Sequence, residues 1–322
     1  MAGRLHHGRL HVAPPARGAG AVNTPVAVIV NAGAGLGYCG ELSQQLHEKF
    51  AAHGMLADIT LAHSGTELIE AAKAALARGV HMVAAGGGDG TINAVASVLA
   101  EAGAGQEVAF GVLPLGTLNH FAKDLHIPLD LDGAIANLAH GQPVRVDVGE
   151  VNGRIFLNNS SLGLYPDIVR DRERQQRRLG RGKWLAFSWA ALAALKRYPF
   201  LSVRLEVDGV AHARRTPFVF IGNNAYQMQG LNIGERERLD GGQLSLYVAQ
   251  RPTRWGLVRL AWHALMGRLA EQRDFDVAAA RELTIETRKS RLRVATDGEV
   301  TVMQPPLIYR IRPGALTVIV PR

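Results

Sequence analysis

Short apolar runs alternate with helical patterns along the first part of the chain, and Gly or Pro bounds most of the runs. The expected strands are residues 26–31, 58–62, 82–85 and 108–113, and the expected helices are residues 41–53, 67–77 and 91–101. Each helical pattern ends near a Gly stop. Regular alternation of strand and helix predicts a doubly wound α/β domain around a parallel sheet.

From about Val146 the pattern changes to shorter runs that alternate or are rich in β-branched residues. The expected strands are residues 146–151, 155–158, 201–207, 218–222, 244–248, 283–287, 292–296 and 308–311. Two helical stretches, residues 183–197 and 255–271, interrupt them. Many short strands are typical of a β-sandwich or barrel. We therefore predict a β-sandwich-like domain after the α/β domain, with the boundary near Arg145.

The composition is that of a globular chain long enough for two domains. The 322 residues are 47% hydrophobic and 20% charged, which excludes a peptide hormone, a disulfide knot and a fibre. Cys39 is the single cysteine, so no internal disulfide forms and a reducing, cytoplasmic compartment is expected. The longest apolar stretch, residues 184–195, is shorter than the roughly 18 to 20 residues that cross a bilayer. No secretory signal is recognised near the N-terminus.

The net charge of +8 is unevenly distributed. Residues through Arg145 hold 8 Lys and Arg against 11 Asp and Glu, whereas the rest holds 28 against 17. A basic second half suggests an anionic partner, either nucleic acid or a lipid headgroup layer, and solvated basic faces without a partner explain it equally well. Zinc-ligand spacing, a helix-turn-helix signature and an RNP-type pattern are all missing from the sequence, so we expect no nucleic acid partner.

Seven Lys and Arg between Arg170 and Lys183 precede an apolar helical stretch that begins at Trp184. This composition suits contact with an anionic membrane surface, as does that of the second stretch, which begins at Trp255. The alternative for both is a helix whose apolar face packs on the β domain while its arginines lie in solvent. We expect a cytoplasmic protein that is peripheral at the inner face of the membrane.

Two glycine-rich turns compete for the role of a phosphate site. Residues 35–40 formally satisfy GxGxxG after the first strand, and Asp58 follows at about the spacing of the ribose-binding acid in dinucleotide folds. The loop is longer than a tight dinucleotide turn, however, and Asp58 begins the second strand, where the acid of that motif usually ends it.

The second turn is the more informative one. Gly86, Gly87 and Gly88 leave a strand and let backbone N–H groups approach an anion, and Thr91 is expected to cap the helix that follows. Asp89 would repel a phosphate unless it holds Mg²⁺ or accepts a proton, so it favours metal-assisted phosphoryl transfer. The alternative is that Asp89 only caps a turn. The GxxxxGK[ST] motif is missing from the sequence, which excludes a P-loop NTPase.

A third loop, residues 113–123, again follows a strand. Ligands of open α/β sheets collect beyond the carboxyl ends of the strands. Thr117 and Asn119 offer a hydroxyl and an amide to a nucleotide or metal there, although each is equally suited to cap a helix.

Two carboxylates flank Gly298 in the second half of the chain. Asp297 and Glu299 follow the expected strand 292–296, so a turn there presents both carboxylates to one place. A carboxylate beside a hydroxyl takes its proton during phosphoryl transfer, while Mg²⁺ neutralises the phosphate oxygens. From the residues alone, the alternative is an ordinary Asp-Gly hairpin turn with solvated acids.

Together these residues resemble the diacylglycerol kinase catalytic domain family, which includes bacterial lipid kinases and the sphingosine and ceramide kinases. The resemblance rests on NAGAG at 31–35, GGGDGTIN at 86–93, LPLGTLNHFAKDLHIP at 113–128 and TDGE at 296–299. The GGDGT element is shared with NAD kinases and is similar to the phosphofructokinase loop. The string at 113–128 narrows the resemblance to lipid kinases.

The resemblance implies a first domain that binds ATP with Mg²⁺, a β-rich domain that completes a cleft, and a chain end that returns to the first domain. The expected division is a loose arm over residues 1–24, an ATP-binding domain over 25–145, a lipid-substrate domain over 146–310 and a returning segment over 311–322. The expected nucleotide contacts are Asn31, Thr60, Gly86, Gly87, Gly88, Asp89, Gly90, Thr91, Asn93, Gly116, Thr117 and Asn119. Glu299 matches the family's proton acceptor, and Asp297 and Asp89 complete the expected catalytic set.

Several positions depart from the family pattern. Ala32 replaces the usual Pro, His120 the usual Asp and Lys123 the usual Arg. Gly241 stands where the family's structural Mg²⁺ site has an Asp, and Asp240 is the expected substitute from one position away. We predict an ATP- and Mg²⁺-dependent kinase that phosphorylates a lipid hydroxyl, with a diacylglycerol-like acceptor. A soluble NAD kinase-like enzyme and a non-catalytic, nucleotide-responsive membrane-binding protein are the alternatives.

Overall fold

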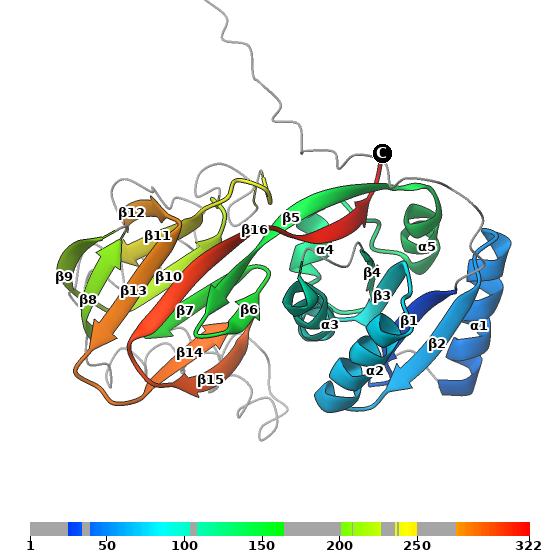
Figure 1. The fold of residues 1–322 in the computed structure, drawn as a ribbon, viewed down its shortest axis with the longest axis horizontal. Coiled ribbons are helices and arrows are strands. Elements are labelled where there is room, and N and C mark those ends of the chain that lie inside the picture. The colour runs from blue at the N-terminus through cyan, green and yellow to red at the C-terminus, as the bar shows by residue number, and fades with distance from the viewer. Residues whose placement is uncertain are drawn as a thin grey trace, which may run out of the picture. The chain divides into compact units, whose positions relative to one another are not determined.

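The computed structural model describes residues 25–33, 39–103, 108–163, 201–207, 209–226, 236, 238–249 and 275–322. These fall into two compact units (Figure 1). The first takes its residues from 1–148, 238–240 and 313–322, and the second from 149–237 and 241–312. The expected arm at 1–24, the basic cluster between Arg170 and Lys183, and the expected helices at 183–197 and 255–271 lie outside the described residues.

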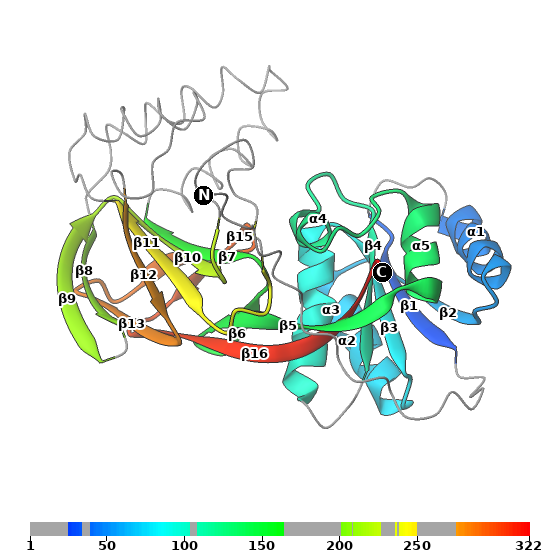
Figure 2. The ribbon, with the colours of Figure 1, turned by 90° about the horizontal axis from the view of Figure 1, so that it is seen from above.

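The first unit alternates strands and helices. Its elements are β1 (Val26–Asn31), α1 (Cys39–Ala52), β2 (Ala57–Ala62), α2 (Gly65–Ala77), β3 (Met82–Gly87), α3 (Asp89–Ala102), β4 (Ala109–Pro114), α4 (His120–Asp124), α5 (Leu131–His140) and the start of β5 (Gln142–Val151). The sheet runs β2-β1-β3-β4-β16, and each of these neighbouring pairs is parallel. Figure 2 shows α1 and α5 on one face of this sheet and α2 and α3 on the other. The predicted doubly wound α/β domain is confirmed.

Helices on both faces explain the sequence of the central strands. In β1, Ala27, Val28, Ile29 and Val30 are all at most 2% exposed, although neighbouring side chains point to opposite faces. Val28 and Val30 pack in one cluster with residues of α1 and α5. A strand that is covered on both faces reads as a continuous apolar run, which is the pattern that predicted it.

The second unit consists of two sheets whose neighbouring strands are antiparallel. Its strands are β6 (Arg154–Phe156), β7 (Asn159–Gly163), β8 (Leu201–Val207), β9 (Val210–Thr216), β10 (Phe218–Asn223), β11 (Leu244–Ala249), β12 (Phe275–Ala280), β13 (Glu282–Thr287), β14 (Leu292–Thr296), β15 (Glu299–Met303) and the start of β16 (Leu307–Val320). One sheet runs β16-β13-β8-β9 and the other β12-β11-β10-β7-β14-β15. Leu162 and Val219 of one sheet share a core with Leu283 and Ile285 of the other. This confirms the predicted β-sandwich-like fold.

The end of the chain returns to the first unit, as expected. Thr317 and Val318 near the end of β16 pair in parallel with Ala109 and Phe110 of β4. The sequence pattern had indicated only a short strand at 308–311. Pro313 and Gly314 interrupt the apolar pattern, but β16 continues through them because its two halves pair with different neighbours, β13 and β4.

Two further expectations about strands need correction. The expected strand 155–158 is wrong in its second half, since β6 ends at Phe156 and the N–H groups of Leu157 and Asn158 donate to a side chain instead of a neighbouring strand. Strand β9 was missed because every residue in it except Thr216 is exposed. It forms through its backbone pairing with β8 and not through apolar alternation.

Candidate active site

Two glycine turns follow the neighbouring strands β3 and β4 and pack directly on each other. A Cβ on Gly116 would lie 2.4 Å from the Cα of Gly88, and a Cβ on Gly87 would lie 2.5 Å from Oγ1 of Thr91. The N–H of Leu115 donates to the carbonyl of Gly87 at 3.0 Å. Side chains at Gly87 and Gly116 would clash with Thr91 and Gly88, so the packing of the two turns requires glycine at both positions. Backbone without side chains also allows close approach of a phosphate.

The end of β1 is tied to the first turn of α3. Asn31 Nδ2 donates to Thr91 Oγ1 at 3.1 Å, and Asn31 Oδ1 accepts from the N–H of Gly33 at 2.9 Å. The N-cap of α3 is Gly88, and no side chain caps the helix through a hydrogen bond. The expected role of Thr91 as a helix cap is therefore wrong. Thr91 is the third residue of α3, and its hydroxyl accepts from Asn31.

Asp89 is the first residue of α3 and holds the most unusual polar atom of this region. Its Oδ1 is buried and has no hydrogen-bond partner among the described residues. A buried carboxylate oxygen without a donor is costly, although the positive end of the helix dipole offsets part of this cost. The atom is thus suited to complete its contacts with a ligand cation.

The residues present fit a Mg²⁺ ion that arrives with a nucleotide. Mg²⁺ binds through one or two carboxylates and takes its other ligands from phosphate oxygens and water. Across the described part of the chain, no group of three or more His, Cys, Asp or Glu side chains is placed to hold a metal by itself. Asp89 would be the protein ligand, and the phosphates would supply the rest.

Asn119 shapes the third loop. Its Nδ2 donates to the carbonyl oxygens of Gly116 at 2.8 Å and Pro114 at 3.3 Å, and its Oδ1 accepts from the N–H of Gly116 at 3.1 Å. Both amide hydrogens are thereby used inside the loop, in a residue that is 7% exposed and has a φ of 52°. Neighbouring Thr117 is exposed. The amide thus holds Gly116 against Gly88, while the Thr117 side chain is open to a ligand.

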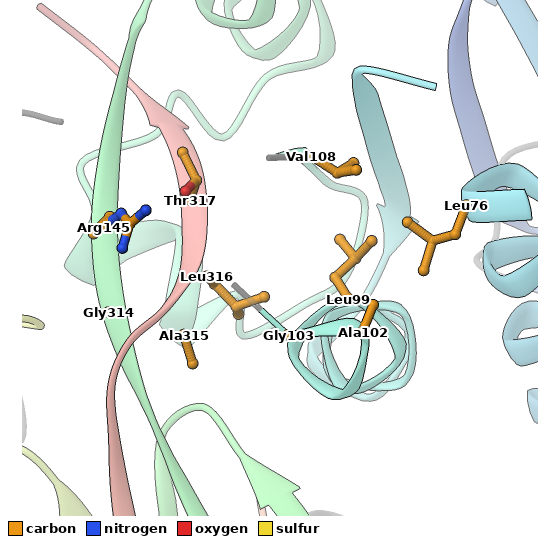
Figure 3. A pocket seen from close by; sticks show the side chains of 10 residues that line it. All are labelled: Leu76, Leu99, Ala102, Gly103, Val108, Arg145, Gly314, Ala315, Leu316 and Thr317. Atoms are coloured by element: carbon orange, nitrogen blue, oxygen red, sulfur yellow. The ribbon is translucent and has the colours of Figure 1, made fainter. Parts of the chain in front are cut away.

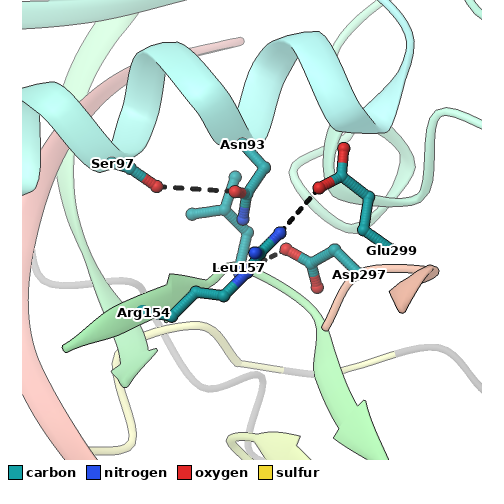
Figure 4. Close-up of polar contacts among 6 residues, drawn as sticks. All are labelled: Asn93, Ser97, Arg154, Leu157, Asp297 and Glu299. Atoms are coloured by element: carbon teal, nitrogen blue, oxygen red, sulfur yellow. Dashed lines mark hydrogen bonds and ion pairs between the residues drawn. The ribbon is translucent and has the colours of Figure 1, made fainter. Parts of the chain in front are cut away.

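The other expected nucleotide contacts in this unit lie further from the glycine turns. Thr60 is exposed on β2, the edge strand, where it pairs with Ile29 two residues before β1 ends. Asn93 lies in the second turn of α3, and its Oδ1 accepts from Ser97 Oγ at 3.4 Å (Figure 4). Asp58, the acid of the possible dinucleotide motif, forms an exposed ion pair with Arg78 at 2.7 Å. Asp58 therefore lies at the start of β2 with a protein partner of its own.

Asp240, the expected substitute in the structural metal site, has a protein partner. Its Oδ1 accepts from Nε of Arg238 at 3.0 Å, and the Asp240 side chain is 8% exposed. The hydrogen bond from Arg238 to this carboxylate raises the pKa of the guanidinium. A cation at Asp240 would have to share the carboxylate with Arg238.

In the second unit, Asp297 lies at the tip of the β14–β15 hairpin and is held by backbone N–H groups. Its Oδ2 accepts from Leu157 at 2.7 Å (Figure 4). Its Oδ1 accepts from Asn158 at 2.8 Å and Asn159 at 3.0 Å. Asp297 and Gly298 have φ angles of 47° and 85°, as the central residues of a type I′ turn require. The carboxylate thus anchors the hairpin tip to the loop between β6 and β7.

Glu299 follows the turn and has a different environment. It begins β15, and its side chain is 61% exposed. Its Oε2 accepts from Nη2 of Arg154 at 2.6 Å (Figure 4). Sequence reasoning missed Arg154, which lies 145 positions earlier on β6 and belongs to no motif. The Glu299 carboxylate is therefore oriented by a cation and remains accessible to solvent.

Arg236 was also missed. It is 4% exposed, and its Nη1 donates to the carbonyl of Leu157 at 2.7 Å while its Nη2 donates to Oδ1 of Asn158 at 2.8 Å. Nδ2 of Asn223 donates to the same Leu157 carbonyl at 2.8 Å. The loop between β6 and β7 is therefore held by a buried cation as well as by Asp297.

A small cavity lies at the other end of the first unit's sheet (Figure 3). It is lined by Leu76, Leu99, Ala102, Gly103, Val108, Arg145, Gly314, Ala315, Leu316 and Thr317. Val108 directly precedes β4, whereas the glycine turns follow the ends of β3 and β4. At about 30 Å³ the cavity has room for roughly one water and not for a nucleotide. The glycine turns remain the candidate nucleotide site.

The protein thus has two units. The α/β unit carries glycine turns suited to bind phosphate, and the antiparallel β unit carries the exposed Glu299 carboxylate. Comparison with protein families agrees. Residues 25–151 match the diacylglycerol kinase catalytic domain, and residues 167–320 match the YegS C-terminal NAD kinase beta sandwich-like domain. The chain therefore contains a diacylglycerol kinase catalytic domain followed by a YegS C-terminal NAD kinase beta sandwich-like domain.

Curated relatives point the same way. The chain is 28% identical over 188 residues to a diacylglycerol kinase of Staphylococcus carnosus, which is 58% of this chain and 60% of that protein. It is 27% identical over 180 residues to a diacylglycerol kinase of Staphylococcus aureus strain JH9, which is 56% of each chain. The match thus spans about three fifths of the length of these relatives.

Solved structures share the fold. A crystal structure of a diacylglycerol kinase from Bacillus anthracis strain Sterne has a TM-score of 0.68 at 20% identity, covering 92% of this chain and 97% of that one. Yeast NADH kinase in complex with NADH has a TM-score of 0.52 at 10% identity, covering 94% and 85%. In the described part of the chain, no helix combines the length and the apolar character needed to span a membrane.

Proposed function

We propose that this chain is a kinase that transfers the γ-phosphoryl group of ATP, with Mg²⁺, to the hydroxyl of a lipid, and that a diacylglycerol-like lipid is the acceptor. The observation that carries the proposal is the buried Asp89 oxygen, which has no partner among the described residues and lies at the start of a helix beside two glycine turns. The similarity to proteins named diacylglycerol kinase supports a lipid acceptor.

We assign nucleotide binding to the first unit. The turns at Gly88 and Gly116 let the phosphates approach the backbone, Gly86 and Gly87 are the buried last residues of β3 that lead into the first turn, and Asn31 holds the Thr91 hydroxyl at its edge. Asp89 would hold Mg²⁺, which neutralises phosphate charge when it is bound. Thr117 is open to the nucleotide, whereas Asn119 contributes by shaping its loop.

We assign the acceptor side of the reaction to Glu299. The lipid hydroxyl oxygen forms a bond to the γ-phosphorus as the bond to the bridging oxygen of ADP breaks, and ADP leaves with that electron pair. The carboxylate of Glu299 takes the hydroxyl proton. Arg154 orients this carboxylate through the 2.6 Å hydrogen bond.

Transfer of labelled γ-phosphate tests the proposal. The full chain would be incubated with labelled ATP and Mg²⁺ and with mixed micelles of diacylglycerol, phosphatidylglycerol, ceramide or a sphingoid base, beside a parallel reaction with NAD. Label in diacylglycerol supports the proposal, and label in another of these lipids corrects the acceptor alone. Label in NAD alone, or in no acceptor, contradicts it and favours a NAD kinase-like or a non-catalytic protein, respectively.

We also infer that the protein acts in the cytoplasm at the inner face of an anionic membrane. The seven Lys and Arg between Arg170 and Lys183, followed by the apolar stretch from Trp184, support this. Sedimentation with vesicles should show binding that rises with the fraction of phosphatidylglycerol and falls with salt. Binding that ignores salt, or no binding, contradicts the inference.

A further inference from the structure

Residues 154–159 contact both the proposed base, Glu299, and Asp297 in the turn that precedes it. Arg154 holds the Glu299 carboxylate at 2.6 Å, and the N–H groups of Leu157 to Asn159 hold Asp297 at 2.7 to 3.0 Å. The main-chain N–H of Asp297 also donates to the carbonyl of Asn159 at 2.9 Å. Residues 154–159 therefore hold both the side chain of Glu299 and the turn that directly precedes Glu299.

The hydrogen bonds of Asp297 separate its role from that of Glu299. Both of its oxygens accept backbone N–H groups, from three donors in all, so the carboxylate serves as an acceptor within the protein. A general base must instead present a free lone pair to the substrate proton. Glu299 accepts from Arg154 through Oε2 and its side chain is 61% exposed, so it meets that condition.

The turn explains how Asp297 acts on its neighbour. Thr296 and Glu299 are paired across the hairpin, so Asp297 and Gly298 are the complete two-residue loop. Asp297 adopts a left-handed φ of 47°, which is unfavourable for most side chains and better tolerated by Asp. Because the turn geometry sets the first residue of β15, the bonds of Asp297 set the direction in which Glu299 leaves the turn.

Arg236 also binds this loop, at the carbonyl group of the residue whose N–H group binds Asp297. The carbonyl of Leu157 accepts from Arg236 and Asn223, while the N–H of Leu157 donates to Asp297. Arg236 reaches the next residue as well, through Oδ1 of Asn158, and its guanidinium lies 5.5 Å from the centre of the Tyr226 ring. A buried cation and a carboxylate therefore hold Leu157 between them.

From these contacts we propose that Asp297 and Arg236 are positioning residues that act on phosphoryl transfer only through Glu299, by fixing the 157–159 loop on which its hairpin rests. Asp297 is then not a second catalytic carboxylate, contrary to the sequence-based expectation. The inference rests on the proposed function, since it takes Glu299 as the base.

Combined substitutions test this dependence. Asp297→Asn should lower kcat about ten- to hundredfold with little change in the KM for ATP, because one amide cannot accept all three N–H groups. Once Glu299→Gln has removed the base, adding Asp297→Asn or Arg236→Lys should lower kcat by no more than about twofold further. Losses that instead multiply would show that Asp297 or Arg236 acts independently of Glu299 and would overturn the proposal.

The pH profile gives a second, independent readout. Asp297→Asn should keep the acidic limb of the kcat profile at a lower rate, because the proposed base is still present, whereas Glu299→Gln should abolish that limb. Loss of the limb in Asp297→Asn alone would identify Asp297 as the base. Asp276→Asn, at an exposed Asp of the same unit that pairs with Arg214 at 3.6 Å, is the matched control and should leave kcat unchanged.

Hydrogen exchange covers the case in which the variants do not fold. In the wild-type chain, the amides of Leu157, Asn158 and Asn159 should exchange at least about a hundredfold more slowly than the amide of Gly153, which lies in the exposed turn of the β5–β6 hairpin. Unprotected exchange would overturn the proposed anchoring. A wild-type chain that is inactive on every lipid but keeps this protection would defeat the proposed function and leave the anchoring intact.

Discussion

The start of α3 in the first unit and the β14–β15 hairpin in the second both present an Asp where sequence motifs place chemistry, but the two residues are in opposite situations. Asp89 has a buried oxygen without a partner in the described chain, whereas both oxygens of Asp297 accept backbone N–H groups. A motif locates a carboxylate. Its hydrogen bonds decide whether that carboxylate is available to a ligand or is part of the scaffold.

The comparison predicts that removal of the exposed Glu299 carboxylate has the largest effect. Glu299→Gln should lower turnover by about 10²- to 10⁴-fold and leave the KM for ATP nearly unchanged, because the amide cannot take the hydroxyl proton. Steady-state kinetics with the lipid acceptor measures this. Glu282→Gln is a matched control, since Glu282 is 52% exposed, pairs with Arg310 at 2.8 Å and lies in the same unit. Equal losses in both variants would contradict the assignment of Glu299.

The two Asp residues should then differ in their effect on the free energy of unfolding. Asp297→Asn should lower it by about 2 to 3 kcal/mol, because a hydrogen-bonded charged group is lost and N–H groups remain without an acceptor. Asp89→Asn should not lower it, because the buried Oδ1 has no partner among the described residues and loss of the charge removes a burial cost, and it should still reduce phosphoryl transfer. Urea denaturation measures both values. Similar destabilisation by the two variants would erase the distinction between them.

The glycine turns allow a comparable test within the first unit. Gly116→Ala would place a Cβ 2.4 Å from the Cα of Gly88, and such overpacking typically costs about 1 to 3 kcal/mol. It should also weaken nucleotide binding, measured by titration with a non-hydrolysable ATP analogue. Gly65→Ala is the control, because a Cβ there meets nothing within 4 Å and Ala is favoured in a helix by up to about 1 kcal/mol. If both variants were equally stable, the packing of the turns would not restrict residue 116.

The smallest expected effect concerns the start of α2. Ser64 caps α2 by accepting from the N–H of Glu67, so Ser64→Ala should cost about 1 kcal/mol of unfolding free energy. Glu67 in turn accepts from the N–H of His63 at 2.8 Å and from the Ser64 hydroxyl at 3.0 Å, and these bonds lower its pKa below the ordinary 4.5.

The pH dependence of this capping box follows from the direction of that shift. A lowered pKa in the folded state stabilises the protein above the ordinary value, and the contribution is lost as the pH falls through the lowered value. Glu67→Gln should therefore be less stable than wild type near neutral pH, and the difference should narrow below about pH 4.5. Thermal melts of both proteins across this range measure the change. A difference that is independent of pH would contradict the prediction.

Much of the α/β unit could be predicted because its pattern is local. Strand β1 was expected at 26–31 and is found there, and the expected bounds of β3 and β4 differ from the structure by one or two residues. Buried parallel strands are continuous apolar runs that stop at glycine, so each is visible without knowledge of its neighbours. The exposed strand β9 and the long β16 were missed or shortened, since they depend on partners elsewhere in the chain.

Within the candidate site, the positions of the glycine turns, Asp89 and the Asp297–Glu299 pair were all visible in the sequence. The roles of Thr91 and Asn119 were not, because each is decided by which neighbour the side chain meets: Thr91 accepts from Asn31, and Asn119 donates within its own loop. A side chain that is equally able to cap a helix or to bind a ligand has no sequence signal that separates the two.

The sequence by itself determined the positions of the glycine turns and of the candidate carboxylates. Glycine turns and the alternation of apolar and polar residues depend on near neighbours in the chain. The tertiary structure alone decided that the Glu299 carboxylate is exposed and that the Asp297 carboxylate is held by backbone N–H groups. Arg154 meets Glu299 across 145 positions and the N–H of Leu157 meets Asp297 across 140, through contacts that exist only once β6, β14 and β15 have assembled. Hydrogen bonds between such distant residues depend on how the strands come together, which local sequence does not encode.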